Sequence, residues 1–317
     1  MDLSFLLSRV TPNTAIALGG LYAFLVVATV LVWLLRRARP GAAMDEVRLR
    51  VLSWWVIIII VSVAMGLGPK VTIVYWGFLS FLALKEYYSI IPTRRADRRV
   101  MLYAYLAIPV QYYFIWTDWY GMFIIFIPVY MFLFLPFRMV LVGETRNWLH
   151  GVSSLHWGLM AMVFGLSHIC YFLMVPAGVN PKGGGAGLIF FLIFLTQFND
   201  VAQFVWGKLL GRHKVVPLVS PGKTWEGLLG GIVTTTAVAW ALSPYLTPMA
   251  YPMSLAAGVL IAVSGFIGDV TISALKRDLG IKDTGNMLPG HGGILDRIDS
   301  LIYTGPLFFH FTRYFYY

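Results

Sequence analysis

The chain has 317 residues, of which 59% are hydrophobic and 12% charged; its formal net charge is +10 and its mean hydropathy +0.76. This composition excludes an ordinary soluble domain and indicates a polytopic helical membrane protein. The positive charge does not require a nucleic acid partner, because basic loops beside anionic lipid head groups explain it. Because the chain has one cysteine, Cys170, disulfides within the chain and thiolate metal sites are excluded. Cys170 lies in an apolar run.

Ten apolar segments follow one another, each near the length that crosses roughly 30 Å of hydrocarbon. They are about 15–35, 51–68, 71–91, 99–116, 119–137, 154–176, 186–206, 224–242, 253–275 and 300–315. The last is also suited to lie in the membrane interface as an aromatic anchor. We therefore expect an all-α, polytopic transmembrane helical bundle of about nine or ten spans. We divide it into N-terminal transmembrane helices (1–150) and a C-terminal transmembrane catalytic region (151–317).

The distribution of Lys and Arg predicts the orientation of the bundle. Basic loops follow the first, third, fifth, seventh and ninth segments, whereas the alternate connections carry two lysines between them. Cytoplasmic loops are the ones enriched in Lys and Arg. The odd-numbered segments should therefore end in the cytoplasm, and the N-terminus should lie outside.

Lys85 and Glu86 lie within the third segment, near its cytoplasmic end. The interpretation that we favour is a lysine that extends to the interface and a carboxylate that faces inward. A direct contact with substrate is the alternative.

The seventh segment carries four polar side chains, at Gln197, Asn199, Asp200 and Gln203. Polar groups inside a membrane helix are costly unless they face a wet cavity or polar partners. Hydrogen bonds between helices would explain Asn and Gln, but they explain Asp200 less well. We therefore favour a functional role for this segment.

A second polar segment precedes the eighth span, with Gly211–Lys214 followed by Ser220–Gly227. Ser220 and Pro221 before an apolar helix predict an N-cap with proline at the first helical position. The open amides of such a helix end, with Lys223 and nearby hydroxyls, would suit a phosphate. Basic residues beside a membrane also serve as topology signals, so charge alone does not decide between these interpretations.

The third polar segment, Asp269–Ser300, holds five Asp, two Lys and two Arg among its 32 residues. Asp269 lies before the end of the ninth span, and Asp296 and Asp299 bracket Arg297. Carboxylates brought together at a membrane surface suit Mg²⁺ that is bound jointly with phosphates. The cations available for a triphosphate or its leaving pyrophosphate include Lys276, Arg277 and Lys282.

These segments carry a longer pattern. Ser273–Arg277, Lys282–Gly285 and Leu288–Asp299 occur at the spacing that is typical of the CDP-diacylglycerol synthases (phosphatidate cytidylyltransferases), and the chain resembles that family. SPGKTWEG at Ser220–Gly227, and Asn199–Asp200 followed by GKLLGRHK, are similar to upstream elements of the same family. The resemblance is specific over roughly residues 197–300.

The resemblance implies transfer of a cytidylyl group from CTP to phosphatidate, giving CDP-diacylglycerol and pyrophosphate in phospholipid biosynthesis. It implies a requirement for Mg²⁺, with room for a second cation, and it is compatible with a homodimer. We expect an integral protein of a bacterial inner (cytoplasmic) membrane, with its site facing the cytoplasm and no nucleic acid partner.

The resemblance also implies roles for individual residues. Metal would be bound by Asp269 and Asp296, with Asp299 as a further ligand, and Asp296 is our main candidate among the later acids. The expected catalytic residues are Asp269, Asp296, Lys276, Arg277, Lys282 and Asp283. Substrate would be bound by Asn199, Asp200, Ser220, Lys223, Thr224, Arg297 and His291, the last of these in a glycine-rich loop where backbone can approach a ligand closely.

Two other functions remain open. A transporter or flippase of an anionic lipid or phosphate compound could use the polar residues of the seventh span as a pathway. Against it, the charges concentrate on one side of the membrane, and no inverted repeat is visible. A CDP-alcohol phosphatidyltransferase is disfavoured, because the DGxxAR…GxxxD…D pattern of that family is absent.

Overall fold

The computed structural model of the chain describes residues 10–38, 41–285 and 292–317. In these residues the fold is all-helical and contains no sheet, apart from an isolated bridge between Lys214 and Thr224. The helices are α2 (Pro12–Ala38), α3 (Ala42–Leu67), α4 (Pro69–Ile90), η1 (Arg95–Asp97), α5 (Arg98–Trp116), α6 (Tyr120–Ile125), η2 (Phe126–Met131), α7 (Phe132–Val140), α8 (Trp148–Gly158), η3 (Leu159–Gly165), α9 (Leu166–Tyr171), η4 (Phe172–Met174), α10 (Gly184–Leu209), α11 (Trp225–Leu246), α12 (Met253–Asp278), α13 (Leu295–Ile298) and α14 (Leu301–Tyr316).

The ten apolar segments expected from the sequence are all helical, so the predicted all-α bundle is confirmed. Two of them are continuous runs of shorter pieces: α6, η2 and α7 form one run, and α8, η3, α9 and η4 form another. In the described part of the chain, seven helical segments are long and apolar enough to cross a membrane. The chain is therefore an integral membrane protein. Crossings by α4, by α5 and by α14, the last with 16 residues and a length of about 24 Å, are not among these seven and stay predictions.

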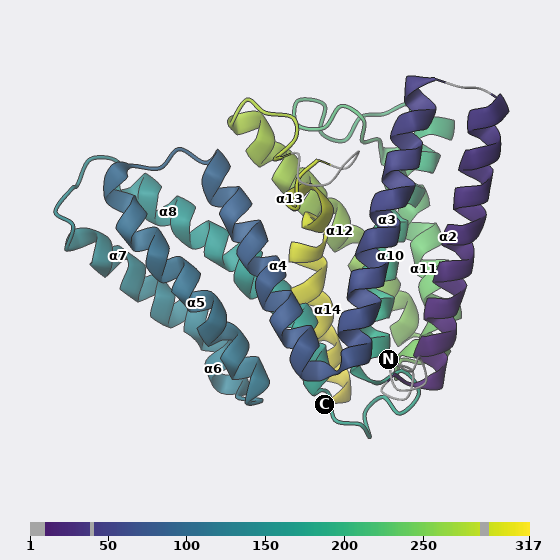
Figure 1. Cartoon of the computed structure of the whole chain (residues 1–317), viewed down its shortest axis with the longest axis horizontal. Helices are drawn as coiled ribbons and strands as arrows, with labels where there is room; N and C mark the ends of the chain where they lie inside the picture. The colour runs from purple at the N-terminus through teal and green to yellow at the C-terminus, as the bar shows by residue number, and fades with distance from the viewer. Residues whose placement is uncertain (1–9, 39–40, 286–291) are drawn as a thin grey trace.

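The helices form two flanks around a centre (Figure 1). Helices α5 to α8 make one flank, and α2, α3, α10 and α11 make the other, with α4, α12 and α14 between them. The most extensive helix contacts are of α10 with α11, of α11 with α12, and of α12 with α14. The three polar segments therefore belong to helices that pack together. The division of the chain at residue 150 falls inside α8 and stays a prediction.

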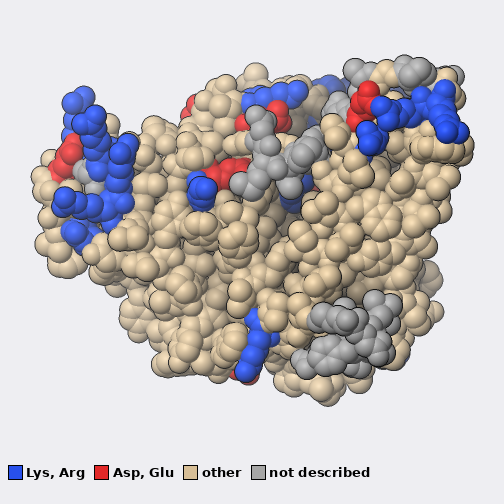
Figure 2. Space-filling model, viewed as in Figure 1, with Lys and Arg blue, Asp and Glu red and all other residues tan. Residues whose placement is uncertain are grey.

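The two sides of the bundle differ in charge. Helices α2, α4, α7, α10 and α12 all end on the upper side in Figure 1, whereas the C-terminus lies on the lower side. Figure 2 shows Lys and Arg gathered along the same upper side, above a broad uncharged band. The basic connections that alternate along the sequence therefore lie on one face of the bundle.

Toward the opposite face, a group of aromatic side chains forms part of the buried core. Phe123, Tyr171, Phe308 and Phe309 are almost fully inaccessible. The rings of Phe123 and Tyr171 lie 4.5 Å apart between centroids, and those of Tyr171 and Phe309 lie 5.5 Å apart. Helix α14 is therefore held at its C-terminal half by apolar packing, while its first residues lie at the charged side.

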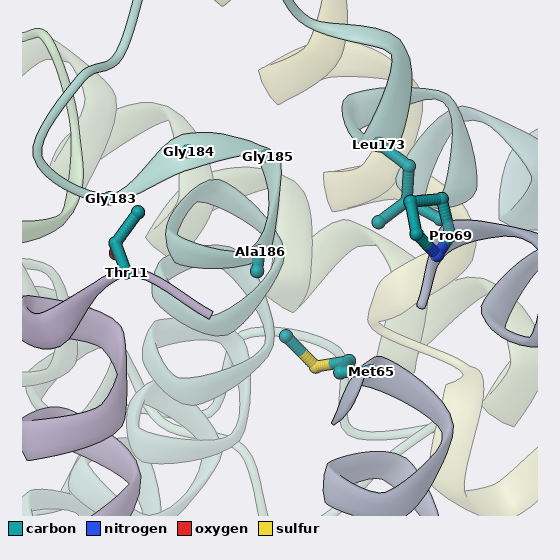
Figure 3. A pocket seen from close by; sticks show the side chains of 8 residues that line it. All are labelled: Thr11, Met65, Pro69, Leu173, Gly183, Gly184, Gly185 and Ala186. Atoms are coloured by element: carbon teal, nitrogen blue, oxygen red, sulfur yellow. The ribbon is translucent and has the colours of Figure 1, made fainter. Parts of the chain in front are cut away.

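A small cavity of about 130 Å³ lies where the turn between α3 and α4 meets the start of α10 (Figure 3). Its lining consists of Thr11, Met65, Pro69, Leu173, Gly183, Gly184, Gly185 and Ala186. No titratable side chain is among these residues. We therefore place the chemistry of the protein elsewhere, at the charged side.

Candidate active site

Three carboxylates and one lysine meet where α10, α12 and the start of α14 pack together. Lys223, in the loop before α11, forms an ion pair with Asp269 on α12 and donates a hydrogen bond of 3.3 Å to Oε1 of Gln203 on α10. Asp200, also on α10, accepts a hydrogen bond of 3.2 Å from the hydroxyl of Ser300. We call Asp200, Asp269, Asp299 and Lys223 the acid cluster.

The acid cluster is electrostatically unbalanced, because three carboxylates face one lysine. Burial, followed by repulsion from Asp269 and Asp200, raises the pKa of Asp299 well above its ordinary value. Burial lowers the pKa of Lys223, but attraction from Asp269 and Asp200 outweighs it, and the net effect is a raised pKa. A cation bound at this place would relieve the repulsion between the carboxylates.

Asp296 lies in a separate set of contacts. Its Oδ1 accepts a hydrogen bond of 2.8 Å from Lys276, and its Oδ2 accepts bonds of 3.0 Å from the backbone amides of Thr284 and Gly293. Burial raises its pKa, but the bonds from Lys276 and from the amide of Thr284 outweigh burial and lower it below the ordinary value. Asp296 is thus an ionised carboxylate whose orientation is fixed by protein donors.

Glu86, on α4, accepts hydrogen bonds from the same two segments that bind Asp296, around Thr284 and at Gly293–Leu295. Its carboxylate accepts hydrogen bonds from the hydroxyl of Thr284 (2.5 Å) and from the amides of Ile294 (2.8 Å) and Leu295 (3.1 Å). The preferred interpretation of an inward-facing carboxylate is confirmed, and Lys85 is exposed. The only signal in the sequence was a carboxylate inside an apolar span, which gives no indication of its partners.

The loop before α11 departs from the prediction made for it. The N-cap at Ser220 is wrong: α11 begins at Trp225, and the hydroxyl of Thr224 accepts the hydrogen bond from the amide of Gly227 at 3.2 Å. The chain turns twice before the helix, with the amide of Ser220 bonded to Val216 and that of Lys223 bonded to Ser220. The helix therefore begins only after these turns, at Trp225.

Other predicted residues have structural partners. The amide of Asn199 donates to the carbonyl of Ala262 at 3.1 Å and accepts from the hydroxyl of Thr235 at 3.2 Å, so it ties α10 to α12 and α11. This is the hydrogen bonding between helices that was the simpler interpretation for an amide at this position. Arg277 donates from Nε to the carbonyl of Val219 at 3.2 Å and holds the loop before α11 against α12.

The remaining predicted residues divide into three cases. Lys282 and Asp283 are exposed, and His291 lies outside the described residues. Arg297 is partly buried, and its Nε has no hydrogen-bond partner among the residues described; the same holds for Nε2 of Gln203 and Oδ1 of Asp200. Arg297 is close enough to Asp200 for the two charges to interact. Buried polar groups without partners are costly. Here the unpartnered acceptor belongs to the acid cluster itself, and the two unpartnered donors belong to neighbouring side chains.

The carboxylate oxygens of the acid cluster are suitable ligands for a hard cation, but the side chains alone do not complete its coordination shell. Within the described ranges, no group of three or more His, Cys, Asp or Glu side chains is arranged to hold a metal ion. The acid cluster nevertheless offers carboxylate oxygens, and Oδ1 of Asp200 is unpartnered there. Mg²⁺ is commonly bound by one or two carboxylates together with substrate phosphates, and the acid cluster matches that description.

The carboxylates and cations of this site suit a divalent cation bound together with phosphates, and comparison with known proteins identifies the family. The sequence model of the cytidylyltransferase family matches residues 48–315, and the chain belongs to that family. The resemblance seen in the motifs is thereby confirmed.

Individual relatives extend this result. The chain is 46% identical over 303 residues to the "uncharacterized protein YnbB" of Escherichia coli (strain K12), covering 94% of this chain and 98% of that protein. It is 42% identical over 130 residues to phosphatidate cytidylyltransferase 5, chloroplastic, of Arabidopsis thaliana, and 35% identical over 129 residues to a phosphatidate cytidylyltransferase of Staphylococcus saprophyticus. The last two matches cover 40% of this chain, and 32% and 50% of those proteins respectively.

Proposed function

We propose that this protein transfers the cytidylyl group of CTP to phosphatidate, at the cytoplasmic face of the membrane, in phospholipid biosynthesis. The observation that carries the proposal is the acid cluster with its unpartnered neighbours. It is built from the same segments that resemble the phosphatidate cytidylyltransferases. Membership in the cytidylyltransferase family supports the nucleotide, and the location of the cluster on membrane helices supports a lipid acceptor.

In the proposed reaction, a phosphate oxygen of the lipid attacks the α-phosphorus of CTP. The new P–O bond forms as the bond from the α-phosphorus to the bridging oxygen breaks, and pyrophosphate leaves. The lipid phosphate is already ionised at neutral pH, so no strong general base is needed. The protein would then act by positioning the two anions and by offsetting their negative charge.

The residues are assigned to three tasks in this proposal. Asp269 and Asp299, with Asp200 beside them, hold Mg²⁺, and the metal role of Asp296 stays a prediction. Mg²⁺, when bound, supplies positive charge to the nucleotide phosphates. Lys276, Arg277, Lys282 and Arg297 hold the nucleotide phosphates, with Asp283 as an auxiliary. The lipid phosphate is assigned to Ser220, Lys223 and Thr224, with Asp200 nearby, and the substrate-binding roles expected for Asn199 and His291 stay predictions.

The alternative of a lipid transporter has less support. The titratable groups of the site lie at one side of the bundle, where Figure 2 shows the charged residues. Toward the other side, the helices that carry the site are packed by buried aromatic side chains such as Phe308 and Phe309. A transport pathway would need polar groups along that direction.

The test is to incubate the purified protein with labelled CTP, Mg²⁺ and phosphatidate in lipid nanodiscs. CDP-lipid and pyrophosphate should form in equal amounts, and chelation of divalent cations should abolish both products. Asp269→Asn should lower turnover at least about 10²-fold, because charge stabilisation of this kind contributes on that scale. Asp45→Asn is the matched control, since Asp45 pairs with Arg36 at the exposed end of α3.

Three outcomes would count against the proposal or part of it. Absence of both products from the wild-type protein with phosphatidate would exclude this reaction, and product formation only from another lipid phosphate would reassign the acceptor. Near-normal turnover by Asp269→Asn would remove Asp269 from the metal site.

A further inference from the structure

Glu86 is a buried carboxylate that belongs to the N-terminal half of the chain but has its partners in the C-terminal half. Its side chain lies on α4 and the residue is only 8% exposed. Oε1 accepts hydrogen bonds from the hydroxyl of Thr284 and the amide of Leu295, and Oε2 accepts from the amide of Ile294. These partners lie 198 to 209 residues further along the chain.

The fit between Glu86 and the loop is close. A buried carboxylate is costly unless donors satisfy it, and each of its oxygens has at least one donor here. A Cβ at position 293 would collide with Oε1 of Glu86 and with the hydroxyl of Thr284, so the backbone can approach only because Gly293 is a glycine. The contact therefore depends on a specific residue on each side.

The segments that donate hydrogen bonds to Glu86 also donate hydrogen bonds to Asp296. The hydroxyl of Thr284 lies 2.5 Å from Oε1 of Glu86 and 3.0 Å from Oδ2 of Asp296, and its single hydrogen can be donated to one of them at a time. The amides of Thr284 and Gly293 both donate to Asp296. Asp296 in turn accepts from Lys276, which completes a chain from α4 to α12.

We propose that Glu86 is a positioning residue of the active site. It fixes the loop around Thr284 and Gly293–Leu295, and through that loop it sets the orientation of Asp296 and Lys276. Glu86 itself does not touch substrate. This inference rests on the proposed cytidylyltransferase reaction, in which Lys276 holds nucleotide phosphate. It follows that turnover depends on a side chain of α4, outside the region where the family motifs lie.

The direct test compares Glu86→Gln with Glu144→Gln, a control in a loop on the same side of the bundle. Glutamine keeps the size of the side chain but removes its charge and one acceptor oxygen. Glu86→Gln should lower kcat about 10- to 100-fold and leave the KM for phosphatidate within about twofold, since misplacement of a positioned group acts on the reacting geometry. Glu86→Asp, which keeps both acceptor oxygens, should recover part of kcat.

Hydrogen exchange of the peptide that contains Ile294 and Leu295 gives a second readout that does not depend on turnover. Glu86→Gln should speed exchange of this peptide at least about tenfold, while peptides of α11 exchange as in the wild type. The internal comparison with α11 separates a local effect from general unfolding.

Thr284→Val supplies an independent variant, because it removes the hydroxyl between the two carboxylates and retains the backbone amide. The double variant should lose less activity than the product of the two single losses, since both changes break one chain of contacts. Independent, multiplying effects would overturn the proposal, as would wild-type kcat and exchange in Glu86→Gln. If the wild type lacks turnover but Glu86→Gln exchanges faster, the proposed reaction fails while the hold of Glu86 on the loop stands.

Discussion

Lys223 is the residue on which the balance of the acid cluster depends. It pairs with Asp269 and contacts Gln203, and it is the lysine that lies among the carboxylates of the cluster. Removing one partner of a largely buried ion pair leaves the other charge uncompensated, which is more costly than the pair itself was favourable. Lys223 should therefore contribute more to turnover than Lys214, the other lysine of the same loop.

We expect Lys223→Gln to lower kcat/KM for the cytidylyl transfer by about 10²-fold, because both the pairing of Asp269 and the charge available to phosphate are lost. Lys214→Gln is the matched control, as Lys214 is exposed on the same loop, and it should stay within about twofold of the wild type. Initial rates of pyrophosphate release measure both. Equal rates for the two variants would show that the acid cluster does not need its lysine.

At the scale of elements, the approach of α12 to the start of α14 decides where Asp299 lies. Gly268 is located at this crossing, and a Cβ there would collide with the carbonyl of Asp299 and contact Cα of Ser300. The neighbouring residue, Asp269, is thereby brought beside Asp299. A small residue before the first acid of the cluster is thus a packing requirement of the site.

Gly268→Ala should lower the free energy of unfolding by about 1–3 kcal/mol, the usual range for overpacking, and should reduce turnover as well. Gly20→Ala in α2 is the control, because nothing lies within 4 Å of the added Cβ and alanine favours a helix. Thermal unfolding in detergent compares the two. If the midpoint of thermal unfolding and the turnover rate of Gly268→Ala are unchanged, α12 and α14 can separate without loss of stability or activity.

At the scale of the whole molecule, the basic connections share one side, which we assign to the cytoplasm. Gly222→Cys and Gly178→Cys test the assignment, because both glycines are exposed in loops on opposite sides and Cys170 is buried. An impermeant thiol reagent should label Gly178→Cys in intact cells, and Gly222→Cys only after permeabilisation. The reverse pattern would place the acid cluster on the face without CTP.

A homodimer stays a prediction, which the mass of the protein in native membranes would test.

Properties that depend on neighbouring residues could be predicted before the fold was known. The length of each apolar run predicts a helix, and the alternation of basic connections predicts which helix ends share a side, since both act locally during insertion. The motif in Asp269–Ser300 was sufficient to indicate the family. All ten helical segments and the membership in the cytidylyltransferase family agree with these predictions.

The pairing of distant polar groups became apparent from the folded structure. It assigned the cap of α11 to Thr224 instead of Ser220, made Asn199 a link between three helices, and separated Asp296 from the acid cluster. It also joined Glu86 to a loop about 200 residues away. Such pairings depend on which donors remain unsatisfied after the helices have packed, and no local pattern of residues records that.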